Sequence, residues 1–170
     1  ILIRSIENMT GRIGLIKRAK DYDKEVENGR NFWDVIIERY NLKINVTNGD
    51  LNNIPKKGPV VIVSNHPFGI LDGLIMGYVL SRARKEFKII ANRVFRKARD
   101  LDDVILPISF EENREGNIQN LNTRNEAIKY LKKGGIVGIF PGGTVATSAK
   151  IFGKPLDPHW KRFTSKLILK

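Results

Sequence analysis

Two residues that could do acid–base chemistry, His66 and Asp72, stand six positions apart where a buried apolar run gives way to a helical pattern. Such strand-to-helix junctions are where α/β sheets bind their ligands. Pro67 pushes the backbone of His66 toward an extended conformation, and Gly69 lets the chain turn back. We therefore expect the Asp72 carboxylate to meet one ring nitrogen of His66. The other nitrogen would then act as a base toward a substrate hydroxyl or amine.

A purely structural interpretation of this pair is also open. In it, His66 is a turn histidine whose hydrogen bonds are satisfied, and Asp72 is a first-turn residue favoured by the helix dipole. Asn65, Pro67 and Phe68 accompany the pair at the junction, and the sequence contains no Ser or Cys in a nucleophile elbow. This context favours a base and an orienting acid that act on a substrate nucleophile.

A second segment, FPGGTVATS at residues 140–148, also follows a buried apolar run. Gly142, Gly143 and Thr144 would present free backbone N–H groups and a hydroxyl to an anion or a developing oxyanion. The segment is not a P-loop, because the Gly-Lys-Ser/Thr ending is missing. Taken alone it also fits an ordinary glycine turn. Two strand ends that carry such segments in one domain are more informative than either.

The surrounding sequence predicts the elements that must position these segments. From Ile44 onward, short apolar runs alternate with helical periods, as in an α/β sheet protein. Thr123 and Glu126 form a capping box that predicts a helix start after a polar loop at residues 111–120. The expected strands are 59–64, 87–92, 104–109 and 135–140, and the expected helices are 1–20, 24–41, 70–84 and 123–133.

These elements predict the α/β class, with a mixed, largely parallel sheet flanked by helices. We expect an N-terminal helical segment at residues 1–43 and the main domain at residues 44–170. The basic amphipathic pattern of residues 1–20 fits either a helix that covers the core or one that lies on a membrane surface.

Composition excludes several classes of protein and site. With 170 residues, 41% of them hydrophobic, the chain has the size and composition of one folded domain. It has no cysteine and only two histidines, His66 and His159, which excludes disulfides, thiol catalysis and a thiolate or histidine-rich metal centre. We therefore expect no metal site. The longest apolar stretch, residues 70–80, is far shorter than the ~20 residues of a membrane-spanning helix.

The two segments resemble a known family. NHPFGILDG, at residues 65–73, resembles the first block of the glycerolipid and lysophospholipid acyltransferases, in which four residues separate His from Asp. FPGGTVATS resembles their third block, FPEGTRS, and the similarity runs from about Ile44 to the C-terminus. The first segment is most similar to the hemolysin-like branch, which includes acyltransferases of ornithine lipid synthesis and carries the same extra residue.

The resemblance implies a glycerolipid-acyltransferase-like fold and the transfer of a fatty acyl group to a hydroxyl or amine of a lyso- or amino-acid lipid. His66 would be the general base and Asp72 its orienting partner. The donor would be an acyl-carrier-protein or acyl-CoA thioester, with no cofactor bound by the protein. Its location would be peripheral, at the cytoplasmic face of a membrane. The implied substrate-binding positions are Asn65, Phe68, Gly69, Pro141, Gly142, Gly143 and Thr144.

The chain also departs from the family pattern. Five residues separate His66 from Asp72, and Gly142 and Val145 stand where the third block has Glu and Arg. That arginine is the residue expected to pair with an acceptor phosphate, so a lysophosphatidic acid acceptor is not favoured. The family's next strand and fourth block would follow Lys170, so we expect the domain to be incomplete at its C-terminal end.

The chain carries a strong positive charge, with 30 Lys and Arg against 18 Asp and Glu and a net charge of +12. Such a field favours nucleic acid, a membrane surface or a phosphorylated substrate. Its densest part, from Arg82 to Arg99, contains eight basic residues and only Glu86 as an acid. This run is either solvated surface or a patch for cofactor phosphates, an acidic acyl carrier protein or anionic lipid headgroups. We expect Arg96 and Arg99, which lie in an approximate second block, to meet substrate phosphate.

Two other functions stay open beside acyl transfer. A basic nucleic-acid-binding module fits the charge, but the chain offers no recognised reading motif and few aromatic residues in the basic run. A noncatalytic acyltransferase relative fits the altered third block. Trp160 fits either an interfacial aromatic or simple packing. No oligomeric state is predicted.

Overall fold

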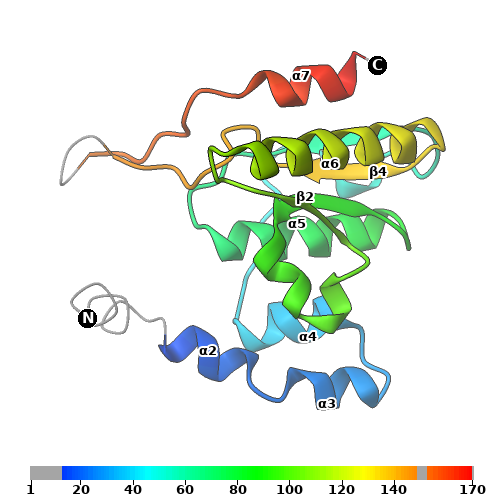
Figure 1. Cartoon of the computed structure of the whole chain (residues 1–170). Coiled ribbons are helices and arrows are strands. Elements are labelled where there is room, and N and C mark those ends of the chain that lie inside the picture. Colours follow the sequence, from blue (N-terminus) through cyan, green and yellow to red (C-terminus); the bar gives the residue numbers. More distant parts are fainter. Residues whose placement is uncertain (1–12, 149–152, 170) are drawn as a thin grey trace. The chain divides into compact units, whose positions relative to one another are not determined.

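The computed structural model describes residues 13–148 and 153–169 (Figure 1). The chain divides into two compact units, Ile1–Asn45 and Val46–Lys170. In the first unit the helices are α2 (Ile13–Ala19), α3 (Tyr22–Glu27) and α4 (Phe32–Arg39). Most of the helix expected at 1–20 lies outside the described residues.

The single helix expected over residues 24–41 is wrong, because the chain breaks between α3 and α4. Gly29 has a φ of +88° there, and the side chain of Asn31 caps α4 by accepting from Trp33 N at 2.9 Å. Arg39 then ties the helices of this unit together. Its Nε donates to Glu25 Oε1 at 2.7 Å, and its guanidinium also donates to the Asp21 carbonyl at 3.1 Å. The hydrogen bond from Arg39 is the main reason that the pKa of Glu25 lies below its usual value.

The second unit is built on a parallel sheet with the strand order β1-β4-β2-β3. Its strands are β1 (Val60–Val63), β2 (Lys88–Asn92), β3 (Ile105–Ile108) and β4 (Ile136–Ile139). All four expected strands and the α/β class are therefore confirmed. The strands are short apolar runs because both faces of the sheet are covered by helices.

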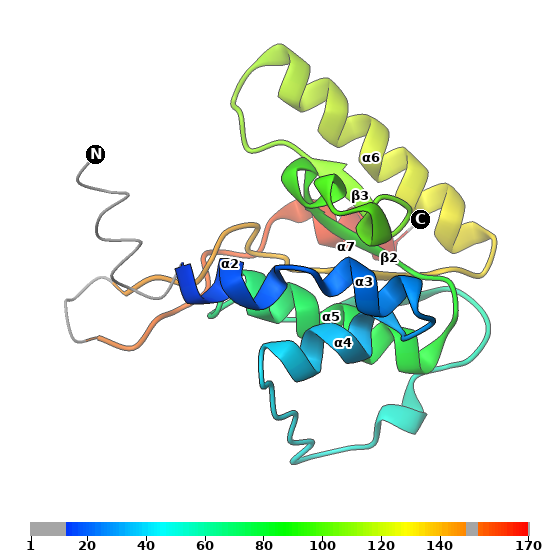
Figure 2. The same cartoon turned by 90° about the horizontal axis from the view of Figure 1, so that it is seen from below.

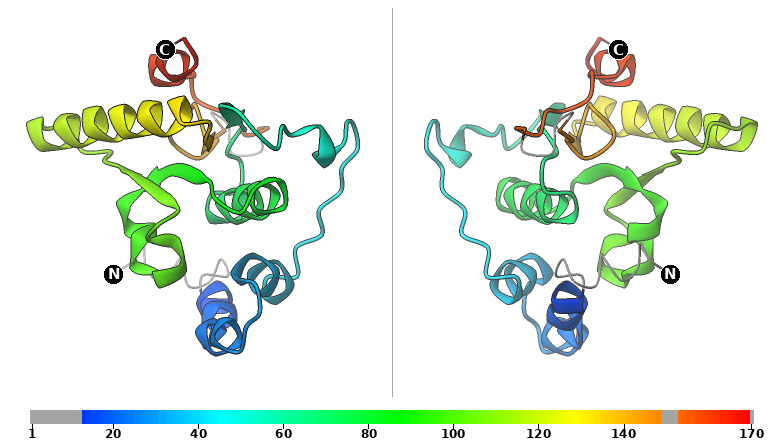
Figure 3. Two further views of the ribbon diagram at one scale, coloured as in Figure 1. Left: turned by 90° about the vertical axis from the view of Figure 1, so that its right-hand side faces the viewer. Right: turned by 90° about the vertical axis from the view of Figure 1, so that its left-hand side faces the viewer.

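Two helices cover the sheet from opposite faces (Figures 1 and 3). They are α5 (Ile70–Ala83), which joins β1 to β2, and α6 (Arg114–Lys132), which joins β3 to β4. The last helix, α7 (Arg162–Ile168), packs against α6. The chain thus leaves β1 toward one face and leaves the neighbouring β4 toward the other. In α/β sheets this divergence places the ligand site at the carboxyl ends of the two strands.

Alternate residues of the central strand β4 face the two helical layers. Val137 and Ile139 belong to the core that includes Leu131 of α6. Gly138 faces α5, and a Cβ at that position would lie 2.9 Å from Met76 Sδ. Because position 138 has no side chain, α5 can pack directly on β4. This packing holds the first turn of α5, and with it Asp72, beside the end of β1.

The start of α6 differs from the sequence-based expectation. The helix begins at Arg114, and Asn113 caps it by accepting from Gly116 N at 2.7 Å. The loop expected at 111–120 is therefore mostly helix, and the capping box at Thr123 is wrong. Thr123 is only 3% exposed, and its hydroxyl donates to the carbonyl of Pro107 in β3. The hydroxyl is satisfied by a neighbouring strand, so it does not cap the helix.

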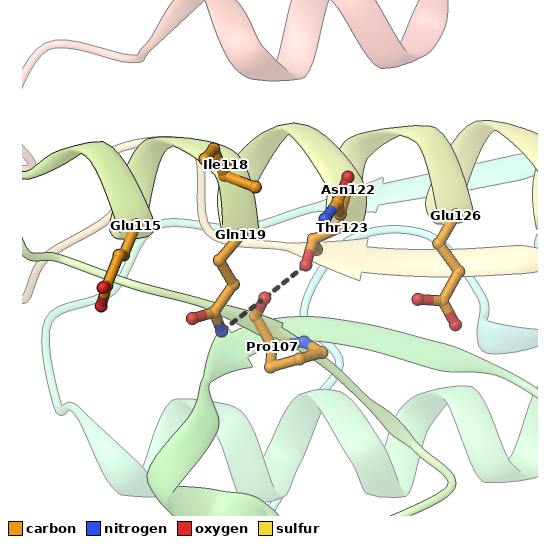
Figure 4. Close-up of a pocket in the computed structure, with 7 residues that line it drawn as sticks. All are labelled: Pro107, Glu115, Ile118, Gln119, Asn122, Thr123 and Glu126. Carbon is orange, nitrogen blue, oxygen red and sulfur yellow. Dashed lines mark hydrogen bonds between the residues drawn. The ribbon is translucent and has the colours of Figure 1, made fainter.

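The helix α6 lies beside β3, the edge strand of the sheet (Figure 2). Side chains of α6 satisfy polar groups in and just after this strand. The Asn120 amide accepts from Ser109 N at 2.9 Å and donates to Ser109 O at 2.9 Å. Figure 4 shows Gln119 and Thr123 directed at the Pro107 carbonyl. A cavity of about 380 Å³ lies here, lined by Pro107, Glu115, Ile118, Gln119, Asn122, Thr123 and Glu126. None of these is a site residue expected from the sequence.

We expect Thr123→Val to lower the free energy of unfolding by about 0.5–1.5 kcal/mol, because it removes the shorter of two hydrogen bonds to the half-buried Pro107 carbonyl without changing side-chain shape. Urea denaturation measures this change. Thr47→Val is the matched control, since Thr47 is exposed, and it should change stability by less than about 0.5 kcal/mol. Equal stability of the two variants would show that this hydrogen bond contributes nothing.

Candidate active site

His66 and Asp72 meet in the loop between β1 and α5. His66 Nδ1 lies 3.0 Å from Asp72 Oδ2, and the same carboxylate oxygen accepts from Phe68 N at 2.7 Å. Gly69 makes this reversal of the chain direction possible. Its φ is +61° and its ψ is −120°, a combination that residues other than glycine rarely adopt. The six-residue spacing is therefore compatible with the pair.

The His66 residue is held from several sides. Its ring stacks on Phe140 with 4.2 Å between centroids, and its side chain is 19% exposed. Its carbonyl accepts from Ala146 N at 2.8 Å, and its backbone N–H donates to Asp157 Oδ1 at 3.0 Å. No described residue hydrogen-bonds Nε2. With Nδ1–H donated to Asp72, the neutral ring leaves the Nε2 lone pair able to accept a proton.

The glycine turn after β4 lies beside this histidine but differs in part from what was expected. Gly143 N donates to Phe140 O at 3.0 Å, so the prediction of a free Gly143 amide is wrong. The amides of Gly142 and Thr144 have no partner among the described residues. Pro141 and Gly142 are buried, and Thr144 is exposed. The turn thus offers an unpaired amide and a hydroxyl at the exposed Thr144, and a second unpaired amide at the buried Gly142.

A third segment, residues 153–161, completes the surroundings of His66 and was not expected from the sequence. It pairs with the glycine-turn loop through an antiparallel bridge between Thr147 and Leu156. Asp157 contacts the backbone of His66, 91 positions away, and its second oxygen lies 3.4 Å from Trp160 Nε1. No local pattern could have identified Asp157, because its partner is so distant in sequence.

The two arginines expected to meet phosphate lie on short 3₁₀ helices that follow β2, η3 (Arg93–Lys97) and η4 (Arg99–Leu101). They therefore share the carboxyl edge of the sheet with His66. Arg96 forms an ion pair with Asp102 at 2.6 Å, and both arginines are exposed. No hydrogen bond or ion pair among the described residues joins either arginine to the His66–Asp72 pair.

The basic run from Arg82 to Arg99 does not form one continuous patch, because β2 passes through it. Its first half lies at the amino end of β2 and its second half at the carboxyl end. In the first half, Arg84 donates to the carbonyls of Pro55 at 2.7 Å and Gly134 at 2.6 Å. These contacts give part of the run a structural role.

In residues 13–148 and 153–169, no cluster of three or more acidic or histidine side chains could hold a metal ion. Over the same ranges, no helix combines the length and the hydropathy that a bilayer crossing requires.

The fold and the site define a parallel α/β domain with a histidine–aspartate pair at the carboxyl edge of its sheet. A family model described as acyltransferase matches residues 43–163, which is most of the chain. The chain belongs to the acyltransferase family. The resemblance found in the sequence is therefore confirmed at the level of the superfamily, and the comparisons do not distinguish its branch.

Two curated relatives carry the same name, lyso-glycine lipid O-acyltransferase. The protein from Bacteroides thetaiotaomicron is 34% identical over 82 residues, which cover 48% of this chain and 29% of the relative. The protein from Phocaeicola vulgatus is 26% identical over 148 residues, 86% of this chain and 50% of the relative. This chain thus spans at most about half the length of these relatives. No solved structure matches it.

Proposed function

We propose that this domain transfers a fatty acyl group from a thioester donor to the hydroxyl of a lyso- or amino-acid lipid. The observation that carries the proposal is the 3.0 Å contact between His66 Nδ1 and Asp72, which leaves Nε2 without a described partner. Membership of the acyltransferase family and the O-acyltransferase relatives support the reaction type and favour a hydroxyl over an amine.

In the proposed reaction, Nε2 of His66 takes the hydroxyl proton as the oxygen attacks the thioester carbonyl. Asp72 stabilises the imidazolium that forms. The tetrahedral intermediate then collapses, the C–S bond breaks, and the imidazolium returns the proton to the leaving thiolate. The free amides of Gly142 and Thr144 are the donors available for the oxyanion. A thioester is already activated, so the reaction needs no covalent enzyme nucleophile.

We also propose that the domain works at a lipid surface. Phe68 is 72% exposed, Leu156 73% and Trp160 56%, and all three lie on the segments that surround His66. Exposed apolar side chains insert into the headgroup region, and each nearby Lys or Arg adds roughly 1 kcal/mol of attraction to anionic lipids. The thioester donors place the reaction at the cytoplasmic face, with acyl carrier protein or coenzyme A as the carrier.

The test is acyl transfer by the purified chain. Acyl carrier protein and coenzyme A thioesters are supplied with lyso-glycine lipid, lyso-ornithine lipid or lysophosphatidic acid in anionic vesicles, and products are measured by mass spectrometry and thiol release. We expect an ester product with at least one acceptor. Absence of product with every pair would overturn the proposal. Steep, salt-dependent binding of an oligonucleotide in place of vesicles would then support the nucleic-acid alternative, and vesicle binding alone would support a noncatalytic relative.

A further inference from the structure

The side chain of Lys161 lies along the glycine turn of the candidate site. A Cβ at Gly143 would be 3.4 Å from Lys161 Nζ and 3.5 Å from its Cε, so the lysine runs over the face that this glycine leaves open. Gly143 has a φ of +79°, and Lys161 N donates to Pro141 O at 3.0 Å. The backbone of Lys161 is thus hydrogen-bonded to the turn, and its side chain lies beside Gly143.

Two further contacts connect the surroundings of Lys161 to His66. Phe140, at the start of the turn, stacks on the His66 ring. Asp157, four residues before Lys161, accepts from the His66 backbone N–H. The backbone of Lys161 is therefore linked to the proposed base by two short connections, which place the lysine on the same side of the domain as the imidazole.

The charge of Lys161 is available to a ligand. No described carboxylate lies within ion-pairing distance of its Nζ, and the Lys161 residue is exposed. The carboxylate of Asp157 is already engaged by His66 N and Trp160 Nε1. The segment at 140–148 contains no charged residue of its own. Lys161 therefore supplies a cation to a turn that offers two free backbone donors.

We propose that Lys161 binds the anionic group of the acceptor lipid beside the glycine turn, while the backbone amides of the turn remain available for the oxyanion. The ligand chemistry is an oxyanion, either an amino-acid carboxylate or a phosphate. An acceptor anchored there presents its hydroxyl to Nε2 of His66. This inference rests on the proposed acyl transfer and adds the specificity-determining residue of the same site.

The kinetic test compares Lys161→Ala and Lys161→Arg with the unaltered chain on three acceptors that each carry a hydroxyl: an N-(hydroxyacyl)glycine with a free carboxylate, its methyl ester, and lysophosphatidic acid. Lys161→Ala should raise KM for the anionic acceptor about 10–100-fold, because a charge-assisted contact is lost, while kcat changes little. Lys161→Arg should restore most of the affinity, and the methyl ester should be insensitive. The acceptor whose KM rises identifies carboxylate or phosphate as the ligand.

Lys166→Ala is the matched control, since Lys166 is an exposed lysine of the neighbouring helix α7, and its KM values should equal those of the unaltered chain. Equal KM changes for acid and ester, or no change on Lys161→Ala, would overturn the inference while acyl transfer itself stands. If no acceptor is turned over, titration calorimetry with a soluble N-acylglycine and its methyl ester still tests whether Lys161 binds the carboxylate. Weaker binding of the acid alone to Lys161→Ala supports the site, and equal binding refutes it.

Discussion

His66→Ala is expected to lower kcat/KM for acyl transfer by about 10²–10⁴-fold, the contribution of a positioned general base. The fold should survive, because the backbone contacts of this residue to Ala146 and Asp157 do not depend on its ring. The lost interactions are the stacking on Phe140 and the hydrogen bond to Asp72. Circular dichroism and a thermal melt check the fold, and steady-state kinetics with the preferred donor and acceptor measure the activity.

His159→Ala is the matched control for this experiment. His159 is the only other histidine in the sequence and is exposed. Its loss should leave the rate within about twofold, since an exposed side chain without a role contributes little. Full activity of His66→Ala would refute the histidine mechanism. A loss of activity in both variants would mean that the effect is not specific to the proposed base.

The second large effect is expected at Asp72, whose Oδ2 joins the imidazole to the Phe68 amide. Asp72→Asn keeps the shape of the side chain but removes the negative charge that stabilises an imidazolium, and its amide can hold the ring in the wrong tautomer. We expect kcat to fall roughly 100-fold or more, as charge removal does in other histidine–carboxylate pairs. For Asp72→Ala, kcat should fall further. The melting temperature should also be lower, because this substitution leaves the Phe68 amide without its acceptor.

The purely structural interpretation of Asp72 makes a different prediction. If the carboxylate only favours the start of α5, Asp72→Asn should lose about 0.3–1 kcal/mol of stability and no activity. Glu115→Gln is the matched control, because Glu115 is the acidic residue in the first turn of α6. Equal effects of these two substitutions on kcat and on the melting temperature would favour the structural interpretation.

The sheet was predictable because its signals are local. Each strand is a short apolar run that must be buried on both faces. Such a run identifies each of β1 to β4 in the sequence, whichever strand it pairs with. The His66–Asp72 contact was predictable for a similar reason. Only six residues separate the two side chains, and Pro67 and Gly69 restrict the backbone between them.

Other predictions were wrong where another hydrogen bond competed with the local pattern. Thr123 followed by Glu126 looks like a helix start, but the Thr123 hydroxyl is directed at Pro107, 16 positions away. The free amide expected at Gly143 is instead closed into a turn with Phe140. In each case a tertiary or turn contact outweighed a weak local preference.

By itself, the sequence determined the alternation of strands and helices, the chemistry of the His66–Asp72 pair and the family resemblance that follows from it. The tertiary structure alone decided which segments surround that pair. The strand order places β1 beside β4, although their paired residues Val60 and Ile136 are 76 positions apart in the sequence. This pairing brings Phe140 and Asp157 to His66 and Lys161 to the adjoining glycine turn. Such contacts depend on the paths of the crossover helices, and no short-range backbone preference encodes them.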